Sequence, residues 1–308
     1  MNILVTGGAG FIASHIVDAF IEAGHNVVII DNLSTGREEN INPKARFYLK
    51  DIREDLSLIF EEHKFDVVNH HAAQIDVRRS VNDPIYDANV NIIGTLNLLQ
   101  NCVKYKVKKF MFASTGGAVY GEQDYFPADE NHKQQPLSPY GISKLAVEKY
   151  LYFYKEVHGL RYTILRYANI YGPRQNPLGE AGVVCIFLDK ILAGDQPIIN
   201  GNGEQTRDYV FVKDVVKANL LTLNEEESQI YNVGTGIETS VNKLFELINE
   251  NFDYRIKEVH GPAKPGEQMR SVITSDKLYK KFGWKPSTSL KDGLKETIEY
   301  YKKISVNK

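Results

Sequence analysis

A tyrosine and a lysine four residues apart form the pair in this sequence best suited to chemistry. Tyr140 and Lys144 open an apolar helical stretch, so both side chains project from one face of its first turns. A free phenol has a pKa of about 10 and is a poor base at neutral pH. An ammonium group beside it stabilises the phenolate and lowers that pKa. The spacing favours acid–base catalysis by Tyr140 with help from Lys144, although the same pattern is common on ordinary surface helices.

A glycine-rich turn near the N-terminus predicts a nucleotide-binding loop. The pattern Gly-x-x-Gly-x-x-Ala, from Gly7 to Ala13, follows a short β-branched run and precedes a helical pattern. Small residues let the backbone approach a pyrophosphate, and the helix N-terminus supplies free N–H donors. Asp31 ends the next apolar run, where a ribose-binding acid is expected. Its carboxylate would repel a 2′-phosphate, so NAD is favoured over NADP, with Arg37 as the one opposing signal.

The elements that must position these residues alternate through the first half of the chain. Strands are predicted near residues 3–5, 27–30, 47–49, 67–69 and 110–112, and helices near 11–21, 56–63 and 85–104. Repeated strand–helix–strand units imply a doubly wound parallel α/β sheet of the Rossmann type with right-handed crossovers.

The second half of the chain is less regular. A strand is predicted over 161–166 and helices over 186–193, 212–223 and 241–251, separated by loops rich in proline. We expect residues 1–166 to form the NAD-binding domain, which the chain re-enters near residues 207–230 and 272–282. Residues 167–308 would then form mainly a smaller C-terminal substrate-binding domain.

Composition excludes several classes of protein. The 308 residues carry 37 basic and 39 acidic side chains, a net charge of −2, which argues against a nucleic-acid partner. Cys102 and Cys185 are too few for a disulfide framework or a thiolate metal site, so no metal is expected. Apolar runs fall short of the about 18 residues of a membrane span, and the N-terminus lacks a signal pattern. These features indicate a cytoplasmic protein without a membrane partner.

Together these motifs resemble the extended short-chain dehydrogenase/reductase family nearly from end to end. Within it, the similarity is greatest to the 4-epimerases of UDP-glucose and UDP-galactose. The resemblance implies NAD-dependent inversion of carbon 4 of a UDP-hexose through a transient 4-keto intermediate. It also implies a homodimer that pairs the helices over 85–104 and 140–158. The segments that carry it are 7–13, 31–33, 91–95, 119–121, 140–144, 166–173, 207–210, 265–266 and 282–284.

The resemblance also implies roles at the cofactor. Asp51 and Ile52 would line the adenine, and Ala72 and Ala73 would flank the pyrophosphate. Tyr167 would lie by the nicotinamide, and Asn91 would stabilise the sheet edge near it. The full set of expected NAD-binding residues is Gly7, Gly10, Phe11, Ile12, Asp31, Asn32, Ser34, Thr35, Gly36, Asp51, Ile52, Ala72, Ala73, Gln74, Asn91, Ser114, Tyr140, Lys144 and Tyr167.

The substrate side is assigned in the same way. A nucleotide diphosphate needs cationic donors and free amides. Glu267 stands where the family usually has the Asp that binds the uridine ribose, and Lys264 where it usually has Arg; Arg270 is a further candidate for the phosphates. The expected substrate-binding residues are Thr115, Gly116, Tyr140, Asn169, Gly182, Val183, Arg207, Lys264, Glu267 and Arg270.

One position departs from the family pattern. The family normally carries Ser or Thr four residues before the Tyr of Tyr120-Gly121, and this chain has Gly116 there. Either Thr115 supplies the missing hydroxyl, which makes it a third catalytic candidate beside Tyr140 and Lys144, or Tyr140 acts without that relay.

Two alternative functions are compatible with the same motifs. A nucleotide-sugar 4,6-dehydratase or decarboxylase of the family would use an Asp or Glu next to the active-site Thr. Gly116, Gly117 and Ala118 follow Thr115 here, which favours the epimerase. A non-catalytic NAD-binding regulator would not need the Tyr-x-x-x-Lys pair, which is intact.

Overall fold

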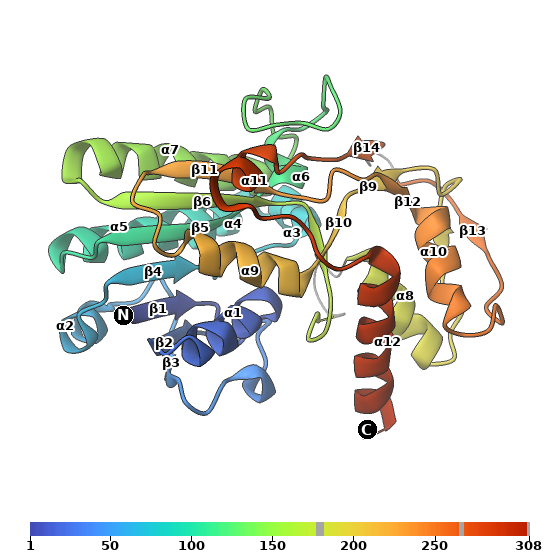
Figure 1. Cartoon of the computed structure of the whole chain (residues 1–308), viewed down its shortest axis with the longest axis horizontal. Helices are drawn as coiled ribbons and strands as arrows, with labels where there is room; N and C mark the ends of the chain where they lie inside the picture. The colour runs from blue at the N-terminus through green and yellow to red at the C-terminus, as the bar shows by residue number, and fades with distance from the viewer. Residues whose placement is uncertain (177–181, 265–267, 307–308) are drawn as a thin grey trace.

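The computed structural model of the protein describes residues 1–176, 182–264 and 268–306. At its centre is a seven-stranded sheet in the order β11-β6-β5-β4-β1-β2-β3, in which neighbouring strands run parallel (Figure 1). This confirms the doubly wound Rossmann-type α/β fold. The strands are β1 (Asn2–Thr6), β2 (Asn26–Asp31), β3 (Arg46–Leu49), β4 (Val67–His70), β5 (Lys109–Thr115), β6 (Arg161–Tyr167) and β11 (Gln229–Val233).

Helices cover both faces of this sheet. Helices α1 and α9 pack against each other on one face, and α2, α5 and α7 contribute to the core on the other (Figure 1). The helices around the sheet are α1 (Phe11–Glu22), η1 (Glu38–Asn40), α2 (Ser57–His63), α3 (Val77–Asn82), α4 (Pro84–Ala88), η2 (Asn89–Ile93), α5 (Gly94–Lys104), α6 (Gly116–Val119), α7 (Pro139–His158), α9 (Val212–Thr222) and α11 (Asp276–Phe282).

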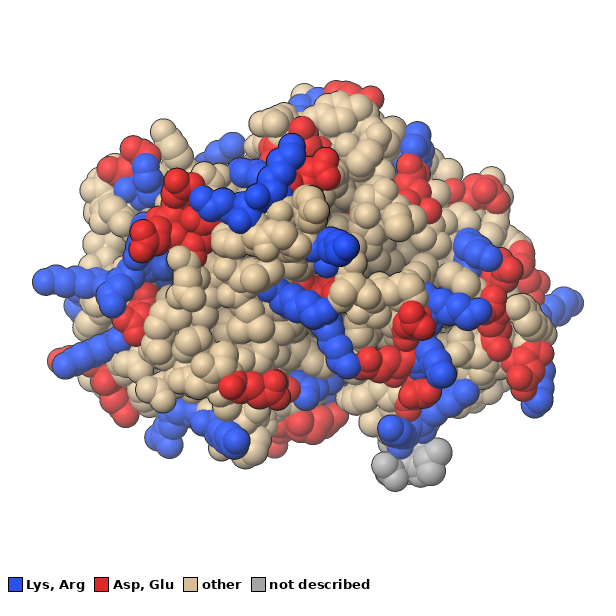
Figure 2. All heavy atoms as spheres, in the orientation of Figure 1, with Lys and Arg blue, Asp and Glu red and all other residues tan. Residues whose placement is uncertain are grey.

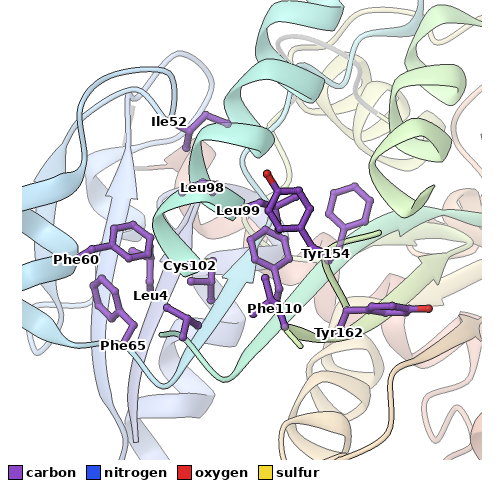
Figure 3. Close-up of a cluster of buried hydrophobic side chains, with 14 of the residues drawn as sticks. Leu4, Ile52, Phe60, Phe65, Leu98, Leu99, Cys102, Phe110, Tyr154 and Tyr162 are labelled. Atoms are coloured by element: carbon purple, nitrogen blue, oxygen red, sulfur yellow. The ribbon is translucent and has the colours of Figure 1, made fainter. Parts of the chain in front are cut away.

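Strand β1 shows why the strand sequences are apolar without a break. Successive side chains of a strand point to opposite faces of the sheet, so both faces need apolar residues when both are covered. Ile3 and Val5 join the core beneath α1 and α9, whereas Leu4 joins the core with Phe60 and Leu98 on the other face (Figure 3). Each of these side chains is fully buried.

A second hydrophobic core lies in the C-terminal part of the chain. Helices α8 (Val183–Leu192), α10 (Val241–Glu250) and α12 (Leu290–Val306) enclose Phe187, Phe245 and Ile298. Cys185 belongs to this core and Cys102 to that of the sheet, and both are free thiols. The short strands of this part are β7 (Asn169–Tyr171), β8 (Ile199–Asn200), β9 (Thr206–Arg207), β10 (Tyr209–Phe211), β12 (Thr239–Ser240), β13 (His260–Gly261) and β14 (Arg270–Ser271).

Several predicted elements differ from the structure in extent. The helix predicted over 85–104 is three consecutive pieces, α4, the π-helical turn η2 and α5. Helix α8 begins three residues before the predicted start at 186. Strand β11 and helices α3, α11 and α12 were not predicted; α3 and α11 have only 6 and 7 residues, too few for an apolar period to register.

The surface carries both signs of charge. Lys and Arg side chains lie among Asp and Glu side chains over the face in Figure 2, in keeping with the net charge of −2. No helix in the described part of the chain has the length and apolarity to cross a membrane.

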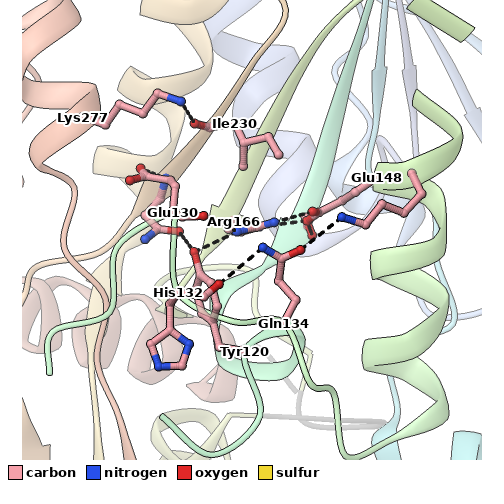
Figure 4. Close-up of polar contacts among 11 residues, drawn as sticks. Tyr120, Glu130, His132, Gln134, Glu148, Arg166, Ile230 and Lys277 are labelled. Atoms are coloured by element: carbon pink, nitrogen blue, oxygen red, sulfur yellow. Dashed lines mark hydrogen bonds and ion pairs between the residues drawn. The ribbon is translucent and has the colours of Figure 1, made fainter. Parts of the chain in front are cut away.

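A buried ion pair joins α7 to the sheet. The guanidinium of Arg166 on β6 donates to both carboxylate oxygens of Glu148 on α7, at 3.0 and 2.6 Å (Figure 4). Its third nitrogen donates to the hydroxyl of Tyr120 at 3.0 Å, and Ser114 Oγ donates to Glu148 at 2.6 Å. Arg166 and Glu148 are 0% and 3% exposed, so the charges compensate each other away from water. This bidentate contact fixes the rotation of α7 against β5 and β6.

We expect Arg166→Met to lower the free energy of unfolding by about 3–5 kcal/mol, because Glu148 would remain as a buried charge without its cation. Urea unfolding followed by circular dichroism measures the change. Arg161→Met, at the partly exposed start of the same strand, is the control and should cost less than about 0.5 kcal/mol. The double variant Glu148→Leu/Arg166→Met should be more stable than Arg166→Met alone. A loss below about 1 kcal/mol for Arg166→Met would contradict this account of the pair.

Candidate active site

A cavity lies where the direction of the strand order reverses. Strands β2 and β4 flank β1, so the crossovers leave on opposite sides and open a crevice at the carboxyl ends of the strands. A cavity of about 340 Å³ occupies this position. Its lining includes most of the predicted cofactor residues: Gly7, Gly10, Phe11, Ile12, Asp31, Asn32, Ser34, Thr35, Gly36, Asp51, Ile52, Ala72, Ala73, Gln74, Ser114, Tyr140, Lys144 and Tyr167.

The glycine-rich loop forms one wall of the cavity. Gly7 has a φ of +72°, and a Cβ there would lie 2.7 Å from the backbone nitrogen of Ala72, so no side chain fits. Gly10 precedes α1, which begins without a side-chain cap, and Phe11 and Ile12 of its first turn line the cavity. First-turn amides of a helix bind anions because they lack partners within the helix. The residues present therefore fit a dinucleotide pyrophosphate.

Asp31 ends β2 at the same wall. Its two carboxylate oxygens accept hydrogen bonds from the backbone N–H groups of Leu33 at 2.8 Å and Ala9 at 3.0 Å. Burial raises the pKa of Asp31, and these two bonds oppose the shift. A Cβ at Gly36 would lie 3.0 Å from this carboxylate, so the absence of a side chain there keeps it open. The remaining lone pairs suit ribose hydroxyls.

Asp51, shortly after the end of β3, also lines the cavity. The guanidinium of Arg53 donates two hydrogen bonds to its carboxylate, both at 2.8 Å, and the N–H of Arg53 and Nδ2 of Asn32 each donate one at 2.9 Å. The bonds from Arg53 are the main reason that the pKa of Asp51 falls to about 2. This carboxylate remains ionised at the cavity wall.

Tyr140 and Lys144, both on α7, also line the cavity. Ser138 caps α7 by accepting a hydrogen bond from the N–H of Gly141 at 3.1 Å, and Pro139 occupies the first turn. Lys144 is 4% exposed, and its Nζ donates to the carbonyl of Ala113 at 2.9 Å. Nζ also lies 5.9 Å from the ring centre of Tyr140. Burial lowers the pKa of Lys144 to about 8, close to neutral pH.

Asn91 does not line the cavity but holds one of its loops. Its Oδ1 accepts from the N–H of Gln74 at 2.8 Å, while its Nδ2 donates to the carbonyl of Gln74 at 2.9 Å. The same Nδ2 lies 3.1 Å from Ser143 Oγ on α7. The loop after β4 is therefore attached to the helix that carries Tyr140.

Tyr167 belongs to a chain of buried polar groups behind the cavity. Its hydroxyl accepts from Asn219 Nδ2 at 2.9 Å and lies 3.2 Å from Nε2 of His71, whose ring stacks on its own. Burial raises the pKa of Tyr167, and burial followed by Lys144 lowers that of His71 to about 3. His71 therefore remains neutral. The adjacent His70 bridges the hydroxyls of Thr6 and Thr95, at 2.6 and 2.8 Å, as a strand-end residue.

Gly116, where the family usually has Ser or Thr, is the first residue of α6, directly after β5. A Cβ at Gly116 would lie 2.6 Å from Cδ1 of Ile273, so this position faces the protein interior. A Cβ at Gly117 would instead lie 3.8 Å from Thr115 Oγ1, 3.9 Å from Ser271 Oγ and 4.0 Å from Asn169 Oδ1. Thr115 Oγ1 accepts from the N–H of Ala118 at 3.2 Å, which orients it toward this turn.

The other predicted substrate residues lie in the C-terminal part. Asn169 begins β7, and Gly182 and Val183 stand at the start of α8. Arg207 on β9 is paired in register with Ser271 on β14, beside Arg270.

The side chains of the two arginines have defined partners. Arg207 donates to the carbonyl of Thr206 at 2.8 Å. Arg270 donates twice to Glu238, at 2.5 and 3.0 Å, and its guanidinium lies 3.6 Å from the ring centre of Phe126. Lys264 is exposed, and Glu267 lies outside the described residues.

The cavity also contains residues that the sequence analysis did not select. His71, Arg79 and Tyr86 line it, and the guanidinium of Arg79 lies 3.9 Å from the ring centre of Tyr86. Gln175 and Asn176 line it from the segment after β7. The position of His71 directly after a strand could have indicated it, because loops at the carboxyl ends of parallel strands bind ligands. No local signal marks Gln175 or Asn176.

Among the described residues, no group of three or more His, Cys, Asp and Glu side chains is arranged to hold a metal ion.

Known proteins share this arrangement along nearly the whole chain. A UDP-glucose 4-epimerase of Mycolicibacterium smegmatis is 41% identical over 312 residues, covering 99% of this chain and 100% of that protein. The crystal structure of a UDP-glucose 4-epimerase of Thermotoga maritima, with UDP-glucose, is 50% identical with a TM-score of 0.96 and covers 99% of both chains. A Thermus thermophilus UDP-glucose 4-epimerase in complex with NAD is 41% identical with a TM-score of 0.93, covering 98% of this chain and 99% of that one.

A family model matches residues 3–234, which include the glycine-rich loop, Asp31, Tyr140 and Lys144. The resemblance to the extended short-chain dehydrogenases/reductases is confirmed, and the chain belongs to the NAD dependent epimerase/dehydratase family.

Proposed function

We propose that the protein inverts carbon 4 of a UDP-hexose, converting UDP-galactose and UDP-glucose into each other with NAD as a retained cofactor. One observation carries the proposal: Tyr140 and Lys144 line the same cavity as the glycine-rich loop and Asp31. The names of the relatives at 41–50% identity support the reaction and the sugar nucleotide. Gly116 and Gly117 follow Thr115 where a dehydratase of the family would carry an acid, which favours epimerisation.

In the proposed mechanism, Tyr140 as phenolate removes the proton from the hydroxyl on carbon 4. The ammonium of Lys144 favours the phenolate by its charge. Bound NAD, held by the glycine-rich loop and Asp31, would supply a reversible hydride acceptor for carbon 4, and the sugar would pass through a 4-keto form. Tyr140 then gives the proton back, so the cycle needs no second substrate. Thr115, whose hydroxyl faces the space above Gly117, supplies the hydrogen bond that Gly116 lacks.

The remaining predicted roles are part of the same proposal. The nineteen NAD-binding residues and the substrate residues Asn169, Gly182, Val183, Arg207, Lys264, Glu267 and Arg270 keep the roles that the family resemblance implies. Residues 1–166 would form the NAD-binding domain, to which α9, β11 and α11 return, and 167–308 mainly the substrate domain.

We also propose a cytoplasmic homodimer. The predicted dimer helices carry apolar side chains on the outer surface: Ile85 and Ile93 on α4 and η2 are 74% and 51% exposed, and Tyr152 and Val157 on α7 are both 59% exposed. Pairing of these faces would remove that surface from water.

Tyr140→Phe is expected to reduce the rate of conversion of UDP-galactose to UDP-glucose by about 10²–10⁴-fold, because it removes the acid–base group. Product identity by chromatography, without added NAD, measures the rate. Tyr150→Phe, on the same helix but not in the cavity, should keep wild-type activity. Full activity of Tyr140→Phe would refute the assignment, and a 4-keto-6-deoxy product would indicate the dehydratase instead.

The rate should fall as pH rises through about 8, because Lys144 loses its proton there and no longer favours the phenolate. A pH profile of kcat tests this. Lys144→Met should lose most activity at every pH, whereas Lys149→Met, on the same helix and outside the cofactor cavity, should keep both the rate and the profile. A profile of the wild type that stays flat well above pH 8 would contradict the role given to Lys144.

Asp31→Asn should weaken discrimination against NADP by about tenfold, a change of about 1.4 kcal/mol, because the carboxylate that repels a 2′-phosphate becomes neutral. Binding of both nucleotides to protein freed of cofactor measures the ratio. Asp55→Asn, at the N-terminal side of α2, is the control for a lost carboxylate outside the cavity. An unchanged ratio in Asp31→Asn would show that Asp31 does not select the cofactor.

A further inference from the structure

Asp87 is a buried carboxylate that the mechanism above does not use. It lies on α4 and is 1% exposed. Its Oδ1 accepts hydrogen bonds from Asn91 Nδ2 at 3.0 Å and Gln74 Nε2 at 3.1 Å. Both donors are neutral amides, and none of the ion pairs among residues 1–176, 182–264 and 268–306 includes Asp87. Burying a carboxylate in this way is unfavourable unless a cation lies near enough to compensate its charge.

Lys144 is the buried cation on α7, the helix that packs against the α4 helix of Asp87. Helices α4 and α7 pack against each other, and the carboxylate of Asp87 is the strongest influence that raises the pKa of Lys144 against the effect of burial. Glu148 is the second such carboxylate, but it already binds Arg166 through both oxygens. The charge of Glu148 is therefore compensated, whereas that of Asp87 is available to Lys144.

The other groups that face Lys144 do not replace Asp87. Tyr140, on α7, has its ring centre 5.9 Å from Nζ, and the phenolate forms only in the reactive state. His70 and His71, at the end of β4, have pKa values lowered first by burial and then by Lys144, so both are neutral. The ring of Phe112, 4.8 Å from Nζ, carries no charge.

Hydrogen bonds connect Asp87 to a residue that lines the cofactor cavity and, through Asn91, to the first turn of α7. Gln74, which donates to Asp87, lines the cofactor cavity. Asn91, the other donor, lies 3.1 Å from Ser143 Oγ, and that hydroxyl donates to the backbone carbonyl of Tyr140 at 2.9 Å. The position of this carboxylate is thus fixed relative to the cofactor loop and to the first turn of α7.

We propose that Asp87 is a positioning residue that acts through Lys144: it is the counter-ion that keeps the buried ammonium charged beside Tyr140, while Gln74 and Asn91 hold it in place. The kinetic part of this inference rests on the proposed function. The electrostatic part does not, because it concerns the charges of Asp87 and Lys144 and is independent of the reaction.

A double-mutant cycle on stability tests the coupling without reference to activity. Asp87→Asn, Lys144→Met and the double variant are unfolded with urea at neutral pH, with bound cofactor content matched. Asp87→Asn should lower the unfolding midpoint in the wild type, and should restore part of the midpoint lost in Lys144→Met, because that variant leaves the carboxylate unpaired. Asp83→Asn, at the N-cap of the same helix, should be additive with Lys144→Met.

Additive effects of Asp87→Asn and Lys144→Met would overturn the proposal. If Asp87→Asn alone does not fold, folding of the double variant supports the coupling, and failure of both argues for a purely structural role.

The pH profile of kcat separates a positioning role from a structural one. Asp87→Asn should move the alkaline limb to lower pH by about one unit, because the ammonium loses its counter-ion, while Asp87→Glu keeps the limb near its wild-type position. A lower rate with an unmoved limb would overturn the proposal. Absence of epimerase activity in the wild type would refute the proposed function and leave the stability cycle as the test of Asp87.

Discussion

The ammonium of Lys144 is buried where β5, α7 and the cofactor cavity meet, and several neighbouring groups stabilise its positive charge. Burial alone pushes the pKa of this group down toward neutrality. The backbone carbonyl of Ala113 accepts a hydrogen bond from Lys144 Nζ, and the aromatic rings of Phe112 and Tyr140 lie near this nitrogen. Carboxylates on two different helices offset part of the desolvation. A base such as Tyr140 gains from a neighbour whose charge is preserved in this way.

The same helix, α7, carries a second buried charge one turn further on. Tyr140, Lys144 and Glu148 follow each other at intervals of four residues, so they share one face of the helix. The ion pair between Glu148 and Arg166 anchors that face to β6 (Figure 4). Ser114 Oγ on β5 donates a hydrogen bond to the same carboxylate. The face that carries Tyr140 and Lys144 is thus held in rotation by the contact between Glu148 and Arg166. In the proposed mechanism this restraint matters, because small displacements of reacting groups reduce the rate strongly.

The position of the cavity follows from the topology of the sheet. In a parallel sheet whose order reverses between β1 and β4, the loops at the carboxyl ends diverge and leave a crevice. Gly7, Asp31 and Ala72 come from the ends of three neighbouring strands and meet there. Asn169 on β7 and Arg207 on β9, which are predicted to bind substrate, lie on short strands outside the seven-stranded sheet.

Local spacing and the alternation of apolar runs were enough to predict strands β1 to β6 of the sheet, the glycine-rich loop, Asp31 and the Tyr140–Lys144 pair. The positions of Asp87, Arg79 and Asn176 at or behind the cavity emerged from the folded structure, since no periodicity marks a residue whose partners lie far along the chain. The structure also showed that a Cβ at Gly116 would meet the side chain of Ile273. The contact between α4 and α7, and with it the charge environment of Lys144, arises from packing between distant segments, which local patterns do not encode.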